Sequence, residues 1–167
     1  MNSTIYASDL LIVIASIAIT IAGFSGVVVA LSGRSTNSFD PVERLNLRIL
    51  LQVSAFALLF SLVPLILQRA LEADTVWRVS MFVYGSAHIF DAGYFVFRTR
   101  SSKAKYNAQK FAPIIGLLIA AYQLIIGSLG NIVLVEISYL IVLLWHLGIA
   151  GMGFVNLVFS SRDEPIS

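Results

Sequence analysis

The sequence predicts an all-α integral membrane protein, a bundle of five transmembrane helices with the N-terminus outside and the C-terminus in the cytoplasm. Hydrophobic side chains make up 58% of the 167 residues and charged side chains only 12%, whereas soluble domains have roughly 45–50% and about 25%. A chain this short cannot hide so much apolar surface from water. The charges also fall between long apolar runs, which is typical of membrane spans.

Five apolar runs are long enough to be spans, because about 20 mainly apolar residues cross about 30 Å of hydrocarbon. The predicted spans are 9–31, 42–68, 77–98, 111–130 and 133–160. Only the turn-forming segment 127–131 and Glu136 separate the last two spans. A single helix over 111–160 would be far too long for one pass at about 1.5 Å per residue. We expect residues 1–167 to form a single transmembrane helical domain.

Basic residues set the expected orientation. Arg34, Arg44 and Arg48 follow the first span, and the segment 98–110 after the third span is also rich in Lys and Arg. By the positive-inside rule, both loops are cytoplasmic. We therefore expect a multi-pass protein of the cell (inner) membrane. In this interpretation the basic residues of the segment 98–110 serve to set the orientation of the chain. As an alternative, they could bind anionic lipid headgroups.

Two prolines and their neighbours mark the second span. Asp40, Pro41 and Glu43 form a typical helix start, with a capping acid, Pro at the first helical position and an acid in the first turn. Pro64 lies inside the same span and removes one backbone hydrogen bond. We expect a helix that begins near residue 41 and is kinked near Pro64.

Small residues recur every four positions in the first span, at Ala18, Ala22, Gly26 and Ala30. In lipid, small side chains let helix backbones approach and gain van der Waals contact. This helix-packing seam has two interpretations: packing within the chain, or a contact between copies in a homo-oligomer. The sequence leaves both open.

A few polar residues lie at membrane depth, where ionisable groups are functional candidates. We expect an intramembrane polar cluster in the cytoplasmic half of the bundle, in which Arg48 reaches inward to pair with Asp91. The other members lie at similar depth or on the same helix. The full cluster is Arg48, Gln52, His88, Asp91 and Asn156. It is interpreted either as a structural ion pair that fixes helix register or as an ion or proton pathway.

Two histidines, His88 and His146, fall near the middle of different spans. Each is expected to be neutral and hydrogen-bonded across a helix pair. As alternatives, the two could bind one haem b axially, or form a proton relay with Tyr84 and Asp91. No cofactor and no metal site are expected beyond this haem alternative.

Several other polar and aromatic residues have simpler interpretations. Tyr6, Trp77 and Tyr139 fall near the outer interface and are predicted to be aromatic-belt anchors. Gln123 is expected to form a hydrogen bond with another helix.

The sequence excludes several kinds of site. There are no cysteines, which excludes disulfides, thiolate metal sites and a cysteine nucleophile. No phosphate-binding glycine loop, HExxH motif or intramembrane lysine is present. We predict no catalytic residues. The expected role is an accessory subunit or homo-oligomeric membrane component, with membrane lipids, further copies or a membrane complex as partners and no nucleic acid. The alternatives are an oligomeric ion or proton channel that uses the Asp/His/Arg cluster, and a haem-binding electron-transfer subunit.

Overall fold

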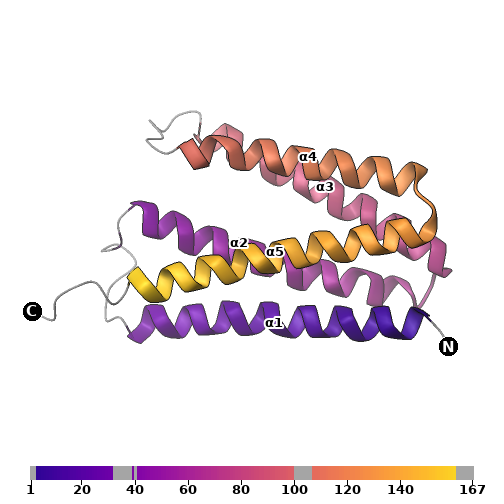
Figure 1. Ribbon diagram of the computed structural model, residues 1–167, viewed down its shortest axis with the longest axis horizontal. Coiled ribbons are helices and arrows are strands. Elements are labelled where there is room, and N and C mark those ends of the chain that lie inside the picture. The colour runs from indigo at the N-terminus through magenta and orange to yellow at the C-terminus, as the bar shows by residue number, and fades with distance from the viewer. Residues whose placement is uncertain (1–2, 32–38, 40, 100–106, 161–167) are drawn as a thin grey trace, which may run out of the picture. The chain divides into compact units, whose positions relative to one another are not determined.

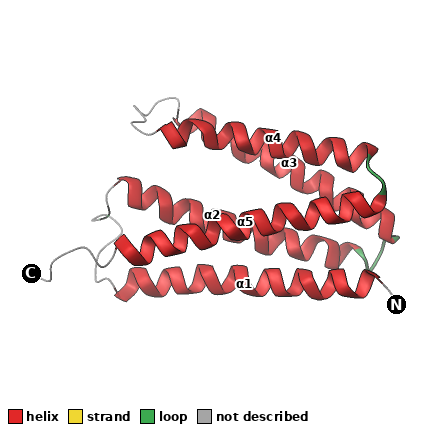
Figure 2. Cartoon of the chain, in the orientation of Figure 1, coloured by secondary structure: helices red, strands yellow, loops and turns green. Residues whose placement is uncertain are grey.

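The computed structural model describes residues 3–31, 39, 41–99 and 107–160, and the regular structure of these residues is entirely α-helical (Figures 1 and 2). The five helices are α1 (Ser3–Leu31), α2 (Pro41–Leu67), α3 (Ala73–Thr99), α4 (Asn107–Leu129) and α5 (Ile132–Ser160). The prediction of five helices is confirmed. α1, α3 and α4 begin several residues before the predicted spans.

Three of the helices are long and apolar enough to cross a membrane, at Ala7–Leu31, Glu43–Leu67 and Ile132–Phe159. The apolar stretch Ile114–Leu129 of α4 is shorter. Large apolar side chains are exposed on the three long helices, and Phe24 of α1 is 57% exposed. Soluble monomers rarely expose extensive apolar surface. These helices therefore suggest a membrane protein.

The start of α2 agrees with the sequence pattern. The helix begins at Pro41, and Glu43 lies in its first turn. The capping residue Asp40 lies outside the described residues. Pro64 lies inside α2, and the kink expected there stays a prediction.

The chain divides into two compact units. Unit 1 comprises Met1–Leu65 and Leu143–Ser167, and unit 2 comprises Ile66–Val142. Unit 1 thus contains α1, most of α2 and the second part of α5, while unit 2 contains α3, α4 and the first part of α5. The single domain expected from the sequence stays a prediction.

In unit 1, the core is formed by apolar side chains at helical spacing. Leu11, Ile14 and Ala18 are buried on one face of α1. Where α2 meets α5, a Cβ atom added at Gly153 would lie 3.2 Å from the Cβ atom of Leu50. The missing side chain therefore allows the two helices to approach closely.

In unit 2, α3 and α4 pack against each other along their lengths, as Figure 1 shows. Two glycines, one from each helix, lie at the contact. A Cβ atom at Gly85 would lie 3.2 Å from Leu124, and one at Gly127 would lie 3.3 Å from Met81. Close packing around these glycines holds α3 against α4. These two helices carry most of the polar residues of the unit.

A tight turn joins α4 to α5, as the segment 127–131 predicts. The backbone N–H of Gly130 donates to the carbonyl of Ile126 at 2.8 Å. A Cβ atom at Gly130 would lie only 2.6 Å from that same oxygen, so the turn requires glycine. The Asn131 side chain then accepts a hydrogen bond from the backbone N–H of Leu134 at 2.9 Å, which is the geometry of an N-cap.

Candidate functional site

The candidate site is a set of polar and aromatic side chains inside unit 2, between α3, α4 and the first part of α5. Its centre is a hydrogen bond between His88 of α3 and Gln123 of α4. The Nδ1 atom of His88 lies 2.6 Å from the Oε1 atom of Gln123. His88 is 4% exposed and Gln123 is fully buried. The predicted interhelical bond of each residue is confirmed.

The geometry selects the tautomer of His88. The Oε1 atom of Gln123 is an acceptor, so the Nδ1 atom of His88 carries the hydrogen and donates it. In a neutral imidazole the Nε2 atom is then the acceptor. Gln123 thus orients the ring and leaves Nε2 as the basic nitrogen of His88.

Aromatic rings continue from His88 toward the start of α3. Tyr84 lies one helical turn before His88 and stacks on it, with ring centroids 4.6 Å apart. Tyr139 of α5 meets Tyr84 edge-on at 5.5 Å and Trp77 at 5.7 Å. The four rings form a continuous aromatic column through the interior of unit 2.

The aromatic column corrects one prediction. Trp77 is only 5% exposed and Tyr139 is fully buried, so neither presents its ring to the surroundings as an aromatic-belt anchor does. Position near a span end cannot distinguish a ring that faces lipid from one that packs on a neighbouring helix. The side chain of Tyr6 lies outside the described residues.

Arg78, near the start of α3, binds the end of α4. Its Nη1 atom donates to the carbonyl of Gly127 at 2.8 Å, and its Nη2 atom donates to the carbonyl of Gly130 at 3.1 Å. The last carbonyls of a helix have no partner within the helix and carry its partial negative charge. Arg78 therefore caps α4.

A second hydrogen bond joins α4 to α5. The hydroxyl groups of Tyr122 and Ser138 lie 2.7 Å apart. Tyr122 is partly exposed and Ser138 is buried. Together with the His88–Gln123 bond, this contact ties α4 to both of its neighbours in unit 2.

Among the described residues of unit 2, two buried polar atoms lack a hydrogen-bond partner, the Nε2 atom of Gln123 and the Oγ atom of Ser80. Ser80, Tyr84 and His88 are spaced four residues apart along α3, and all three are buried. One face of α3 is therefore polar and enclosed by protein. An unpaired buried donor such as the amide of Gln123 is suited to a bound water molecule or a small polar ligand.

In unit 1, the second histidine has a different environment. His146 is 6% exposed, and its ring centroid lies 6.0 Å from that of Phe56 on α2. The predicted haem ligands, His88 and His146, thus belong to different units. The predicted proton relay of His88, His146 and Tyr84 likewise draws its residues from both units. Haem binding and the relay stay predictions.

The predicted intramembrane cluster is likewise divided between the units. Arg48, Gln52 and Asn156 belong to unit 1, and His88 and Asp91 belong to unit 2. Asp91 and Gln52 are half-buried, whereas Arg48 and Asn156 are exposed. The pairing of Arg48 with Asp91 stays a prediction. Among the described residues, no group of three or more His, Asp or Glu side chains could hold a metal ion.

The structure places the two ends of the predicted packing seam differently. Ala18 is 1% exposed and Ala22 is half-buried, whereas Gly26 and Ala30 are exposed. No atom lies within 4 Å of a Cβ position at Gly26. The first part of the seam therefore packs within the chain, and the second part remains an open surface.

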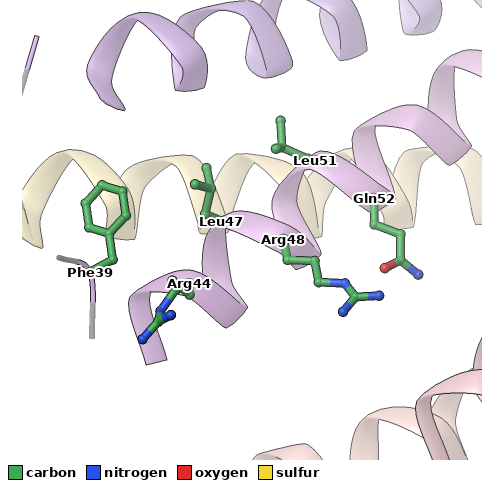
Figure 3. A pocket seen from close by; sticks show the side chains of 6 residues that line it. All are labelled: Phe39, Arg44, Leu47, Arg48, Leu51 and Gln52. Carbon is green, nitrogen blue, oxygen red and sulfur yellow. The ribbon is translucent and has the colours of Figure 1, made fainter. Parts of the chain in front are cut away.

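Arg44, Arg48 and Gln52 line a pocket on α2 with three apolar side chains, Phe39, Leu47 and Leu51 (Figure 3). Its volume is about 470 Å³. Arg48 and Gln52 were predicted to belong to the intramembrane cluster, and this pocket was not predicted. The four-residue spacing of Arg44, Arg48 and Gln52 was the available signal.

Comparison of the chain with protein-family models, with curated proteins and with solved structures finds no match.

Proposed function

We propose that this chain is a five-span membrane protein, N-terminus outside and C-terminus cytoplasmic, that acts as a non-enzymatic membrane component. In this proposal it is an accessory subunit of a larger complex or a homo-oligomer. The observation that carries the proposal is the exposed apolar surface of α1, α2 and α5. Ile12, Ile19 and Phe24 of α1 are each more than half exposed, and lipid or a partner helix would cover them.

The interactions inside unit 2 support α3 and α4 as further spans. In hydrocarbon, polar groups must be satisfied within the protein. His88 bonds to Gln123, and Arg78 bonds to the backbone of α4. These contacts would let α3 cross the membrane although His88 and Asp91 interrupt its apolar sequence. They also engage the polar side chains in helix packing, which supports a structural role.

Membrane insertion and orientation can be tested together. The expected result is a chain that stays in the membrane pellet after alkaline carbonate extraction. A reporter fused after Ser167 is expected to be active only in the cytoplasm, and one fused after Arg69 only outside. Release by carbonate would contradict an integral protein, and an external signal after Ser167 would contradict the orientation.

Self-association through α1 can be tested at the open part of the seam. Gly26→Leu adds a large side chain to the exposed surface and is expected to lower the yield of crosslinked dimer in membranes. Thr20→Leu is a matched control, because Thr20 is exposed and lies about 120° away from Gly26 around α1, at about 100° per residue. An equal dimer yield in both variants would exclude this surface as the contact.

A second candidate is an oligomeric ion or proton channel that uses Asp91, His88 and Arg48. The enclosed polar face of α3 favours it, because the unpaired atoms of Gln123 and Ser80 could hold water beside His88. The test is ion and proton flux into protein-loaded liposomes, with Asp91→Asn as the comparison. Flux in the native chain that the variant loses would support the channel, and no flux in either would exclude it.

A further inference from the structure

The pocket on α2 combines a cationic stripe with an apolar one. Arg44, Arg48 and Gln52 lie four residues apart, so their side chains follow one another along one side of the helix, as Figure 3 shows. Each step along this stripe is about 6 Å. Leu47 and Leu51 are also four residues apart and line the same pocket. The two stripes run beside each other along the first turns of α2.

The described residues that line the pocket carry two positive charges, the guanidinium groups of Arg44 and Arg48, and none of these lining residues is an acid. Among the described residues at the start of α2, the only acid is Glu43, which is half-buried and not part of the lining. The positive end of the helix dipole lies in the same place. Both Arg44 and Arg48 are exposed, so an anion can approach them.

We propose that this pocket binds an anionic phospholipid, with the phosphate between Arg44 and Arg48 and the acyl chains along Leu47 and Leu51. The planar guanidinium group of arginine matches the oxygens of a phosphate in pairs. Gln52 supplies a neutral donor at the deeper end of the same stripe. Phe39, which is 5% exposed, forms an apolar wall at the other end.

The inference rests on the proposed function, because that orientation puts the start of α2 at the cytoplasmic interface. Anionic lipids are abundant there and attract basic side chains. A free phosphate would satisfy the two arginines but would leave the leucine stripe uncovered. The apolar half of the pocket therefore favours a lipid as the source of the anion.

The experiment measures lipid binding to the purified full chain in detergent by native mass spectrometry. The probes are phosphatidylglycerol, phosphatidylcholine with the same acyl chains, and inorganic phosphate as a competitor. The variants are Arg44→Gln, Arg48→Gln and the double variant. Arg69→Gln is the matched control, because Arg69 is an exposed arginine just after the other end of α2.

The native chain is expected to prefer phosphatidylglycerol. Each glutamine substitution should weaken the binding of phosphatidylglycerol about fivefold, since one arginine near the membrane surface contributes about 1 kcal/mol to binding. Arg69→Gln should bind like the native chain. Salt should lower the preference of the native chain, which tests the inference even if a variant fails to fold.

Three results would overturn the lipid site. They are equal binding of the two lipids, a folded double variant that binds phosphatidylglycerol as the native chain does, and displacement of the lipid by an equal concentration of inorganic phosphate. Displacement by inorganic phosphate would show that the two arginines bind a free anion and not a lipid. A chain that resists carbonate extraction but has no lipid preference would contradict only this inference, whereas release by carbonate would contradict the proposed function.

Discussion

The Nδ1 atom of His88 and the Oε1 atom of Gln123 lie 2.6 Å apart, and each side chain is enclosed by protein. This bond joins the middle of α3 to the second half of α4. It fixes the ring orientation of His88 and the register of the two helices at the same point. It also leaves one donor of Gln123 without a partner, so the amide is only partly satisfied.

Replacement of His88 by leucine is expected to destabilise the protein by about 1–3 kcal/mol, because it leaves the buried Gln123 amide without its partner. Gln123→Leu should have a similar effect. The double variant should lose less stability than the two single variants lose together, since it removes both polar groups. Denaturant unfolding in detergent micelles measures all three. Strictly additive effects would show that the bond does not couple the helices.

Arg78→Gln is expected to lower the free energy of unfolding by about 1.5–3 kcal/mol, because charged hydrogen bonds to two helix-end carbonyls are lost. The control is Arg69→Gln, which removes an exposed charge from the connection before α3 and should change stability by less than about 0.5 kcal/mol. Equal midpoints for the two variants in the unfolding experiment would contradict the capping role of Arg78.

Gly130→Ala should destabilise the protein by about 1–3 kcal/mol, because the added methyl group meets the carbonyl oxygen of Ile126 and the turn must shift. Gly93→Ala is the matched control, since Gly93 is exposed on α3 and no atom lies within 4 Å of its Cβ position. Alanine there should be neutral or stabilise α3 by up to about 1 kcal/mol. Thermal unfolding of both variants separates the clash from the general effect of losing a glycine.

The haem alternative makes a spectroscopic prediction. If His88 and His146 bind one haem b, the purified chain absorbs in the Soret region, and His88→Ala or His146→Ala removes the six-coordinate spectrum. Gln123→Leu should broaden or shift the band, because the bond that orients His88 is lost. A chain grown with excess haem that shows no such absorbance would exclude this alternative.

The helices follow from composition alone. Each apolar run between charges became a helix, and the turn at Gly130 and the start at Pro41 follow from local residue preferences. These features depend on neighbours in sequence. Helix length and turn chemistry depend on residues that are close together in the sequence, so the sequence was sufficient for them.

The contacts of the candidate site could not be derived in the same way. Arg78 bonds to carbonyls about 50 residues away, and any arginine near a span end has the same local pattern. Trp77 and Tyr139 look like interfacial anchors until packing places them against each other. His88 and Gln123 could each be expected to bond across helices, but their pairing depends on helix register, which periodicity does not determine.

The cap that Arg78 forms on α4 has a consequence for biosynthesis. When Arg78 leaves the ribosome, the carbonyls that it will bind are not yet available to it, because they belong to residues 127 and 130, which follow it by 49 and 52 residues. A nascent α3 alone would bring an arginine, a histidine and an aspartate to the translocon without these acceptors. In the proposed five-span topology, we therefore expect α3 to be retained there until α4 emerges, so that the two helices enter the bilayer together as a hairpin.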